Sequence, residues 1–98
     1  MAAYWVAHVQ VLDAEKYAGY TALAPAAFAR HGATFLVRGG EAEVLEGSLP
    51  DRHVVIEFPT LDAARACYHS SEYQNAKALR DGHCIAHVVI MQGLPTSA

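Results

Sequence analysis

The stretch YWVAHVQVL, residues 4–12, alternates in polarity with a period of two. Such alternation is typical of a β-strand that is covered on one face only. One face of the predicted strand is apolar, and it carries Trp5, Ala7, Val9 and Val11. The opposite face is mixed, and it carries Tyr4, Val6, His8 and Gln10. The chain therefore opens with a half-buried strand whose second face remains to be accounted for.

A helix is predicted directly after this strand. Asp13 is a suitable N-cap, and Glu15 in the first turn is favoured by the helix dipole. Tyrosine, alanine and phenylalanine residues then recur at helical spacing as far as Phe28. Pro25 lies inside this run and lacks a backbone donor, which predicts a kink or two short helices. Gly32 is expected to end the helical region.

The segment 33–38, ATFLVR, is the second predicted strand, and Gly39-Gly40 follows it. A Gly-Gly pair suits a tight hairpin turn, so residues 42–46 are expected to pair back on this strand. A phosphate-binding loop is disfavoured, because no helix is predicted after Gly40 and no GxGxxG or GKS/T motif is present.

Residues 52–58, RHVVIEF, form the third main predicted strand. Thr60 is expected to cap a following helix, and a capping box from Ser71 to Gln74 predicts a second helical segment that ends at about Arg80. A last strand is predicted over residues 83–92. The order β-α-β-β-α-β predicts a single α+β domain over residues 1–98, with a ferredoxin-like split βαβ sandwich and an antiparallel sheet covered by helices on one face.

The uncovered face of this sheet is expected to be largely apolar. It would carry Tyr4, Val6, Val55, Ile85, Val89 and Met91. An exposed apolar surface of this kind usually marks a contact with another molecule. We therefore expect a homodimer that forms through the open sheet face.

Composition excludes several classes of protein. The formal net charge is −3 and no basic cluster is present, so no nucleic-acid partner is expected. No segment approaches the length of a membrane span, and the first residues lack the features of a signal peptide. A cytoplasmic protein without membrane association is expected. Cys67 and Cys84 are then predicted to be reduced thiols.

The order and spacing of several motifs resemble those of the domain of unknown function 1330 family, a branch of the dimeric α+β barrel (ferredoxin-like) superfamily. The resemblance runs through YWVAHV (4–9), Tyr17, Tyr20 and Pro25, the run from Gly32 to Gly47, VVIEFP (54–59), the run from Ala64 to Arg80, and Gly93. It implies that two subunits join their open sheet faces into a dimeric α+β barrel. The wider superfamily includes cofactor-free monooxygenases, haem-degrading oxygenases, isomerases, dehydratases and ligand-sensing domains, so the fold alone selects no reaction.

Strand parity selects candidate catalytic residues on the open face. If Trp5 and Ala7 face the helices, His8 faces the open side, and His87 in the last strand does the same. Glu57 shares the face opposite Val54 and Ile56. Together His8, His87 and Glu57 could perform acid–base chemistry near the dimer interior. Purely polar interface residues would produce the same pattern.

Candidate binding residues are more scattered. Arg38 is the best single anchor for an anion, and its parity with Leu36 would bring it to the open face; pairing with Glu41 or Glu57 is the alternative. Tyr17, Tyr20, Tyr68 and Tyr73 could line a cleft between helices and sheet. His53 joins them as a binding candidate on the open face. His8, His53 and His87 could also hold a metal, although their spacing is weak evidence, and neither a metal nor a cofactor is predicted.

Three functions agree with these residues, and the sequence does not decide whether the protein is an enzyme. The first is cofactor-free His/Tyr acid–base chemistry on a small carbonyl, phenolic or polyketide-like molecule. The second is a non-catalytic ligand-binding or stress-response module. The third is a monooxygenase, either cofactor-free or haem-dependent; a surplus of histidines is the only feature that favours haem.

Overall fold

The first predicted strand lies in the interior of a four-stranded sheet. In the computed structural model, which describes residues 1–95, β1 (Ala3–Val11) pairs with β3 (Arg52–Phe58) on one side and with β4 (Cys84–Gln92) on the other. β2 (Thr34–Arg38) pairs with β3. All pairs are antiparallel and the strand order is β2-β3-β1-β4. This is the predicted ferredoxin-like α+β fold.

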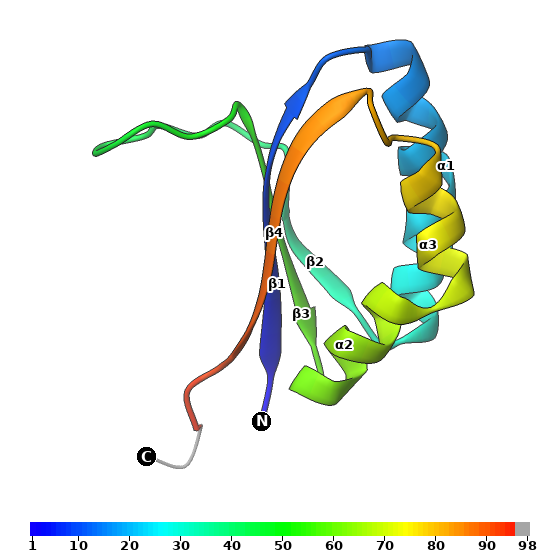
Figure 1. Ribbon diagram of the computed structural model, residues 1–98. Coiled ribbons are helices and arrows are strands. Elements are labelled where there is room, and N and C mark those ends of the chain that lie inside the picture. Colours follow the sequence, from blue (N-terminus) through cyan, green and yellow to red (C-terminus); the bar gives the residue numbers. More distant parts are fainter. Residues whose placement is uncertain (96–98) are drawn as a thin grey trace.

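Three helices cover one face of the sheet and leave the other open (Figure 1). They are α1 (Ala14–Arg30), α2 (Leu61–His69) and α3 (Ser71–Ala78). The predicted caps form, since the side chains of Asp13 and Thr60 accept hydrogen bonds from backbone N–H groups in the first turns of α1 and α2. The cap of α3 is Ser70, one residue before the predicted capping box.

Of the two alternatives predicted at Pro25, a kink or two short helices, the two short helices do not form. α1 runs without interruption over 17 residues. Pro25 removes one backbone hydrogen bond, but Ala24, Ala27 and Phe28 on either side of it are buried. Packing of this face against the core therefore outweighs the local cost of the proline.

The core gathers around Trp5, which is almost completely buried. Phe28 and Tyr73 meet its ring edge-on, each with a centroid distance of 5.0 Å, and Phe58 stacks on it at 6.0 Å. Such aromatic pairs add to the free energy gained by burying their area. This cluster joins α1, α3 and the sheet at one end of the molecule.

The predicted hairpin after β2 does not form. Residues 42–46 are not in a strand, and β2 pairs with β3 instead. A tight type I′ turn needs positive φ at both central residues, whereas only Gly39 has it, with φ of 68°. Residues 40–51, which we call the arm, project from the sheet on the side away from the helices (Figure 1).

A register shift between Phe35 and Val37 interrupts the alternation in β2. Phe35 lies opposite Ile56, Val37 opposite Val55, and Arg38 opposite Val54. Because Ile56 and Val54 face the helices, Arg38 faces them too. The prediction from simple parity, which placed Arg38 on the open face, is therefore wrong: the bulge adds one residue and reverses every later side chain.

Candidate functional site

A cavity of about 500 Å³ lies between α1 and the sheet. Most of the residues that line it are apolar, and the polar ones are three arginines, two tyrosines and one threonine. The apolar wall consists of Trp5, Ala7, Val9, Ala24, Pro25, Phe28, Phe35, Val54, Ile56, Ala86 and Val88. The polar groups belong to Tyr17, Tyr20, Thr21, Arg38, Arg52 and Arg80. A concave, mostly apolar site with a few polar groups is the usual form of a small-molecule pocket.

Small side chains explain why space remains here. The helix-facing residues of β1 change from Trp5 to Ala7 and Val9 along the strand. Ala86 lies opposite Val9 on β4, and Ala24 faces the cavity from α1. At the Trp5 end, large rings fill the space between α1 and the sheet. At the opposite end, these smaller side chains do not reach across that space.

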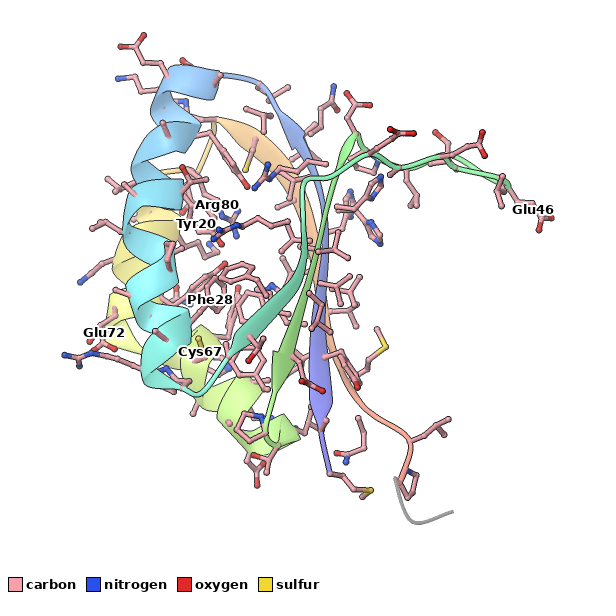
Figure 2. All side chains as sticks on the ribbon, turned by 180° about the vertical axis from the view of Figure 1, so that it is seen from behind. Tyr20, Phe28, Glu46, Cys67, Glu72 and Arg80 are labelled. Carbon is pink, nitrogen blue, oxygen red and sulfur yellow. The ribbon has the colours of Figure 1, made fainter. Side chains whose placement is uncertain are left out.

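Arg80 is the most buried charged residue of the described chain, with 7% of its surface exposed. Its guanidinium lies 4.9 Å from the centre of the Tyr20 ring, and Figure 2 shows both side chains between the helices and the sheet. One amino group donates to the Tyr73 hydroxyl at 3.3 Å, and the other lies 3.7 Å from the Cys84 sulfur. Burial by itself lowers the pKa of Arg80, but its contacts with Tyr73 outweigh this effect and raise the pKa, so the group stays charged.

Arg52 and Arg38 enter the cavity from the sheet. Nε of Arg52 is buried and has no hydrogen-bond partner among residues 1–95. The guanidinium of Arg38 lies 4.5 Å from the centre of the Phe35 ring. Together with Arg80, the cavity receives three cationic side chains.

None of these three arginines forms an ion pair within the described part of the chain. The ion pairs found there are Arg30–Glu72, Arg65–Asp62 and Lys77–Asp81, and none of these residues lines the cavity. The alternative in which Arg38 pairs with Glu41 or Glu57 is thus not observed. The cavity carries positive charge without a compensating carboxylate.

The two tyrosines of the cavity are neutral. Burial raises the pKa of Tyr20, and the neighbouring Tyr73 hydroxyl, 3.0 Å away, raises it further. Burial also raises the pKa of Tyr17, although the charge of Arg52 opposes the rise. Because both phenols remain protonated at neutral pH, they can donate hydrogen bonds but cannot act as bases.

The other two candidate tyrosines do not line this cavity. Tyr73 is completely buried and acts behind the wall, as the hydrogen-bond partner of both Tyr20 and Arg80. Tyr68 lines a second hollow of about 540 Å³, which also contacts Arg80. Of the four tyrosines predicted to line a cleft, the structure places Tyr17 and Tyr20 in the wall of the first cavity.

The candidate catalytic residues lie on the opposite, open face of the sheet. His53, His8 and His87 occupy directly opposed positions on β3, β1 and β4. Nδ1 of His8 and Nδ1 of His53 form a hydrogen bond of 2.9 Å, so one of these two nitrogens carries the proton and the other accepts it. His87 lies on the same face but makes no such bond within residues 1–95. Glu57 accepts a hydrogen bond of 3.4 Å from Tyr4.

Within residues 1–95, no three His, Cys, Asp or Glu side chains gather closely enough to hold a metal ion. The wall of the first cavity contains no histidine, so no imidazole is placed there as an axial ligand for haem. The same part of the chain contains no helix that is long and apolar enough to cross a membrane.

A family model described as "Domain of unknown function (DUF1330)" matches residues 2–94. The chain belongs to this family. The resemblance inferred from the sequence motifs is therefore confirmed. A search of curated proteins finds no match to this DUF1330 protein.

Three solved structures with the same fold come from proteins that are described differently. A protein of unknown function from Rhodopseudomonas palustris is 18% identical, with a TM-score of 0.76; the match covers 96% of this chain and 83% of that one. SnoaB, a cofactor-independent oxygenase from Streptomyces nogalater, is 15% identical, with a TM-score of 0.65 and coverage of 97% and 95%. A dimeric protein of unknown function with a ferredoxin-like fold from Bacteroides fragilis is 11% identical, with a TM-score of 0.64 and coverage of 94% and 96%. At these identities, the likeness establishes the fold of the DUF1330 protein.

Sequence reasoning missed two charged residues of the cavity, Arg52 and Arg80. For Arg52 a signal was present, because it shares the parity of Val54 and Ile56 and so belongs to the helix-facing side of β3. Arg80 offered no such signal, since it follows α3 in a turn. Its position depends on how the turn folds back over Tyr20.

Proposed function

We propose that this protein binds a small organic molecule in the cavity between α1 and the sheet. The observation that carries the proposal is the cavity itself, with its apolar wall, its two neutral phenols and its three arginines. A volume of about 500 Å³ falls within the usual range for small-molecule sites. Tyr20 or Tyr17 could donate a hydrogen bond to a carbonyl or phenolic oxygen, which suits a carbonyl, phenolic or polyketide-like ligand.

Filling the cavity tests this proposal. Ala24 is buried and lines the cavity from α1, whereas Ala26 is exposed on the same helix. Native mass spectrometry of the purified protein and a thermal-shift screen of metabolites should first identify a ligand. Ala24→Leu should then weaken its binding, and Ala26→Leu should leave it unchanged. Equal binding by both variants would place the ligand elsewhere and refute the proposal.

Acid–base chemistry by His8, His87 and Glu57 is a separate proposal, because these residues lie across the sheet from the cavity. The His8–His53 hydrogen bond favours it, since it holds two imidazole rings together on the open face. A ligand on this face would contact His8, His53 and His87 rather than Tyr20. Loss of turnover in His8→Gln, with turnover retained in Tyr20→Phe, would support this location; the reverse result would contradict it.

We also propose that two copies join through their open faces into a dimeric α+β barrel. Ile85, Val89 and Met91 on this face are each more than 40% exposed in one chain. The arm projects on the same side and carries Leu45, which is 83% exposed, so it could lie along a partner. The Bacteroides fragilis protein of the same fold is described as dimeric.

Two other functions remain as alternatives to an acid–base enzyme. A non-catalytic ligand-binding or stress-response module would use the same cavity without turnover. A monooxygenase is suggested by the likeness to SnoaB, described as a cofactor-independent oxygenase. Oxygen consumption in the presence of the identified ligand would separate the two. The expected cytoplasmic location stays a prediction.

A further inference from the structure

The cavity between α1 and the sheet has a cationic end and an aromatic end. Strand register defines three rows of helix-facing residues. Phe35, Ile56 and Trp5 form the first row, while Arg38, Val54 and Ala7 form the second. Arg52 and Val9 lie in the third. The first row therefore contributes aromatic side chains to the cavity, and the second and third rows each contribute an arginine.

The buried charge at the cationic end is only partly compensated. Tyr73 and Cys84 accept hydrogen bonds from Arg80, but neither is a carboxylate. Arg52 keeps a buried Nε–H without a partner in the described chain. A buried charge without an opposite charge is costly, so proteins normally pair it.

The acidic residues of the chain do not supply this pairing. The sequence contains 10 Asp and Glu residues, and none of them lines the cavity. Several lie in the arm, and Figure 2 shows Glu46 at its far end, away from Tyr20 and Arg80. No carboxylate of the described chain therefore compensates the charge of the three arginines.

We infer that the natural ligand is an organic anion, an aromatic carboxylate whose ring lies towards Trp5 and Phe35 and whose carboxylate is bound by the arginines. This inference rests on the proposed binding function and specifies the class of ligand. A guanidinium matches a carboxylate through two parallel hydrogen bonds, and flat rings suit the aromatic wall.

The test compares matched pairs of acid and amide. Benzoate, 2-naphthoate and anthracene-2-carboxylate are titrated calorimetrically beside benzamide, 2-naphthamide and anthracene-2-carboxamide, and inorganic phosphate is titrated alone. Members of a pair have nearly the same shape and differ in charge. We expect at least one acid to bind roughly tenfold or more tightly than its amide, since hydrogen bonds to charged groups are the stronger ones.

Two arginine variants and one control variant test whether the preference for the acid arises in the cavity. Arg38→Gln and Arg52→Gln should each reduce the preference for the acid over the amide. Arg30→Gln is the matched control, because Arg30 pairs with Glu72 outside the cavity and should keep the full preference. Arg38 is exposed, so its variant should fold even if the loss of Arg52 destabilises the protein.

The remaining outcomes separate the two proposals. Equal binding of acid and amide would overturn the inference of an anion but retain the binding function. Phosphate binding as tightly as the best acid would overturn the requirement for an organic body. If no acid and no amide binds, the inference fails, whereas the proposed binding function is decided separately by the comparison of Ala24→Leu with Ala26→Leu.

Discussion

Tyr73 connects two polar side chains of the cavity without lining it. Its hydroxyl bonds to the Tyr20 hydroxyl at 3.0 Å and accepts from Arg80 at 3.3 Å. Its ring meanwhile packs against Trp5, Phe28 and Tyr68. One residue thus joins the packing of the core to the position of the buried charge.

Tyr73→Phe should separate these two roles. The ring stays, but Arg80 loses a buried hydrogen-bond partner, so the free energy of unfolding should fall by about 1–3 kcal/mol. Tyr68→Phe is the control, since the Tyr68 hydroxyl makes no hydrogen bond within residues 1–95, and its effect should be within about 0.5 kcal/mol. Urea unfolding at one fixed protein concentration measures both. Equal stability of the two variants would contradict the importance of the Tyr73 hydroxyl.

Because of Cys67, the free energy of unfolding should fall as the pH rises through the alkaline range. Burial, with a smaller effect of Glu72, raises the pKa of this thiol from 9.0 to about 11. The neutral thiol therefore stabilises the folded state fully below pH 9.0, and this contribution is lost as pH rises towards 11. The difference in free energy of unfolding between wild type and Cys67→Ala should be constant below pH 9.0 and shrink above it. A difference independent of pH would show that the thiol titrates equally in both states.

At the scale of elements, the end of β2 decides where the arm begins. The Gly39 N–H donates to the His53 carbonyl at 2.9 Å, which is the last bond between β2 and β3. Gly39 has positive φ, and a Cβ built there would collide with the Arg52 guanidinium. Gly40 has neither constraint, since its φ is not positive and its Cβ position is open.

The two adjacent glycines form a matched pair for mutation. Gly39→Val should lower the free energy of unfolding by about 1–2 kcal/mol, because a β-branched residue fits poorly at positive φ. Gly40→Val should change it by less than about 0.5 kcal/mol. Thermal unfolding of both variants checks this. Equal melting temperatures would show that the turn is not built around Gly39.

At the scale of the whole molecule, the two faces of the sheet differ in what they contact. The helix-facing side buries Trp5, Ile56 and Phe58 within the chain. The open side leaves rows of apolar residues in contact with solvent, interrupted by the row of three histidines. The dimer proposal assigns this second face to another copy of the chain.

A charge placed on the open face tests the dimer. Val89 on β4 is 47% exposed, and Leu23 on α1 is 50% exposed. Val89→Glu should produce a monomer, because it would bury a carboxylate in the interface. Leu23→Glu, a change of similar exposure on the helical side, should leave the dimer intact. Light scattering at micromolar concentration measures the mass; a monomeric wild type, or a dimeric Val89→Glu protein, would contradict the proposal.

Periodicity by itself determined the faces of β1, β3 and β4. A strand repeats every two residues, so one recognised apolar face assigns every other side chain. This is why the common face of His8, His53, Glu57 and His87 could be predicted. The caps Asp13 and Thr60 were equally readable, since capping depends on residues within one turn.

The binding site depended on the tertiary structure. A single bulge in β2 reversed the face of Arg38, and no local signal marks where such a residue is inserted. The cavity exists because Ala7, Ala24 and Ala86, far apart in sequence, meet across one layer. The position of Arg80 depends on contacts with Tyr20, Tyr73 and Cys84 that form only when α3 packs beside α1. Local periodicity specifies the face to which each side chain of one strand points. A cavity and its charge depend instead on how several elements pack together.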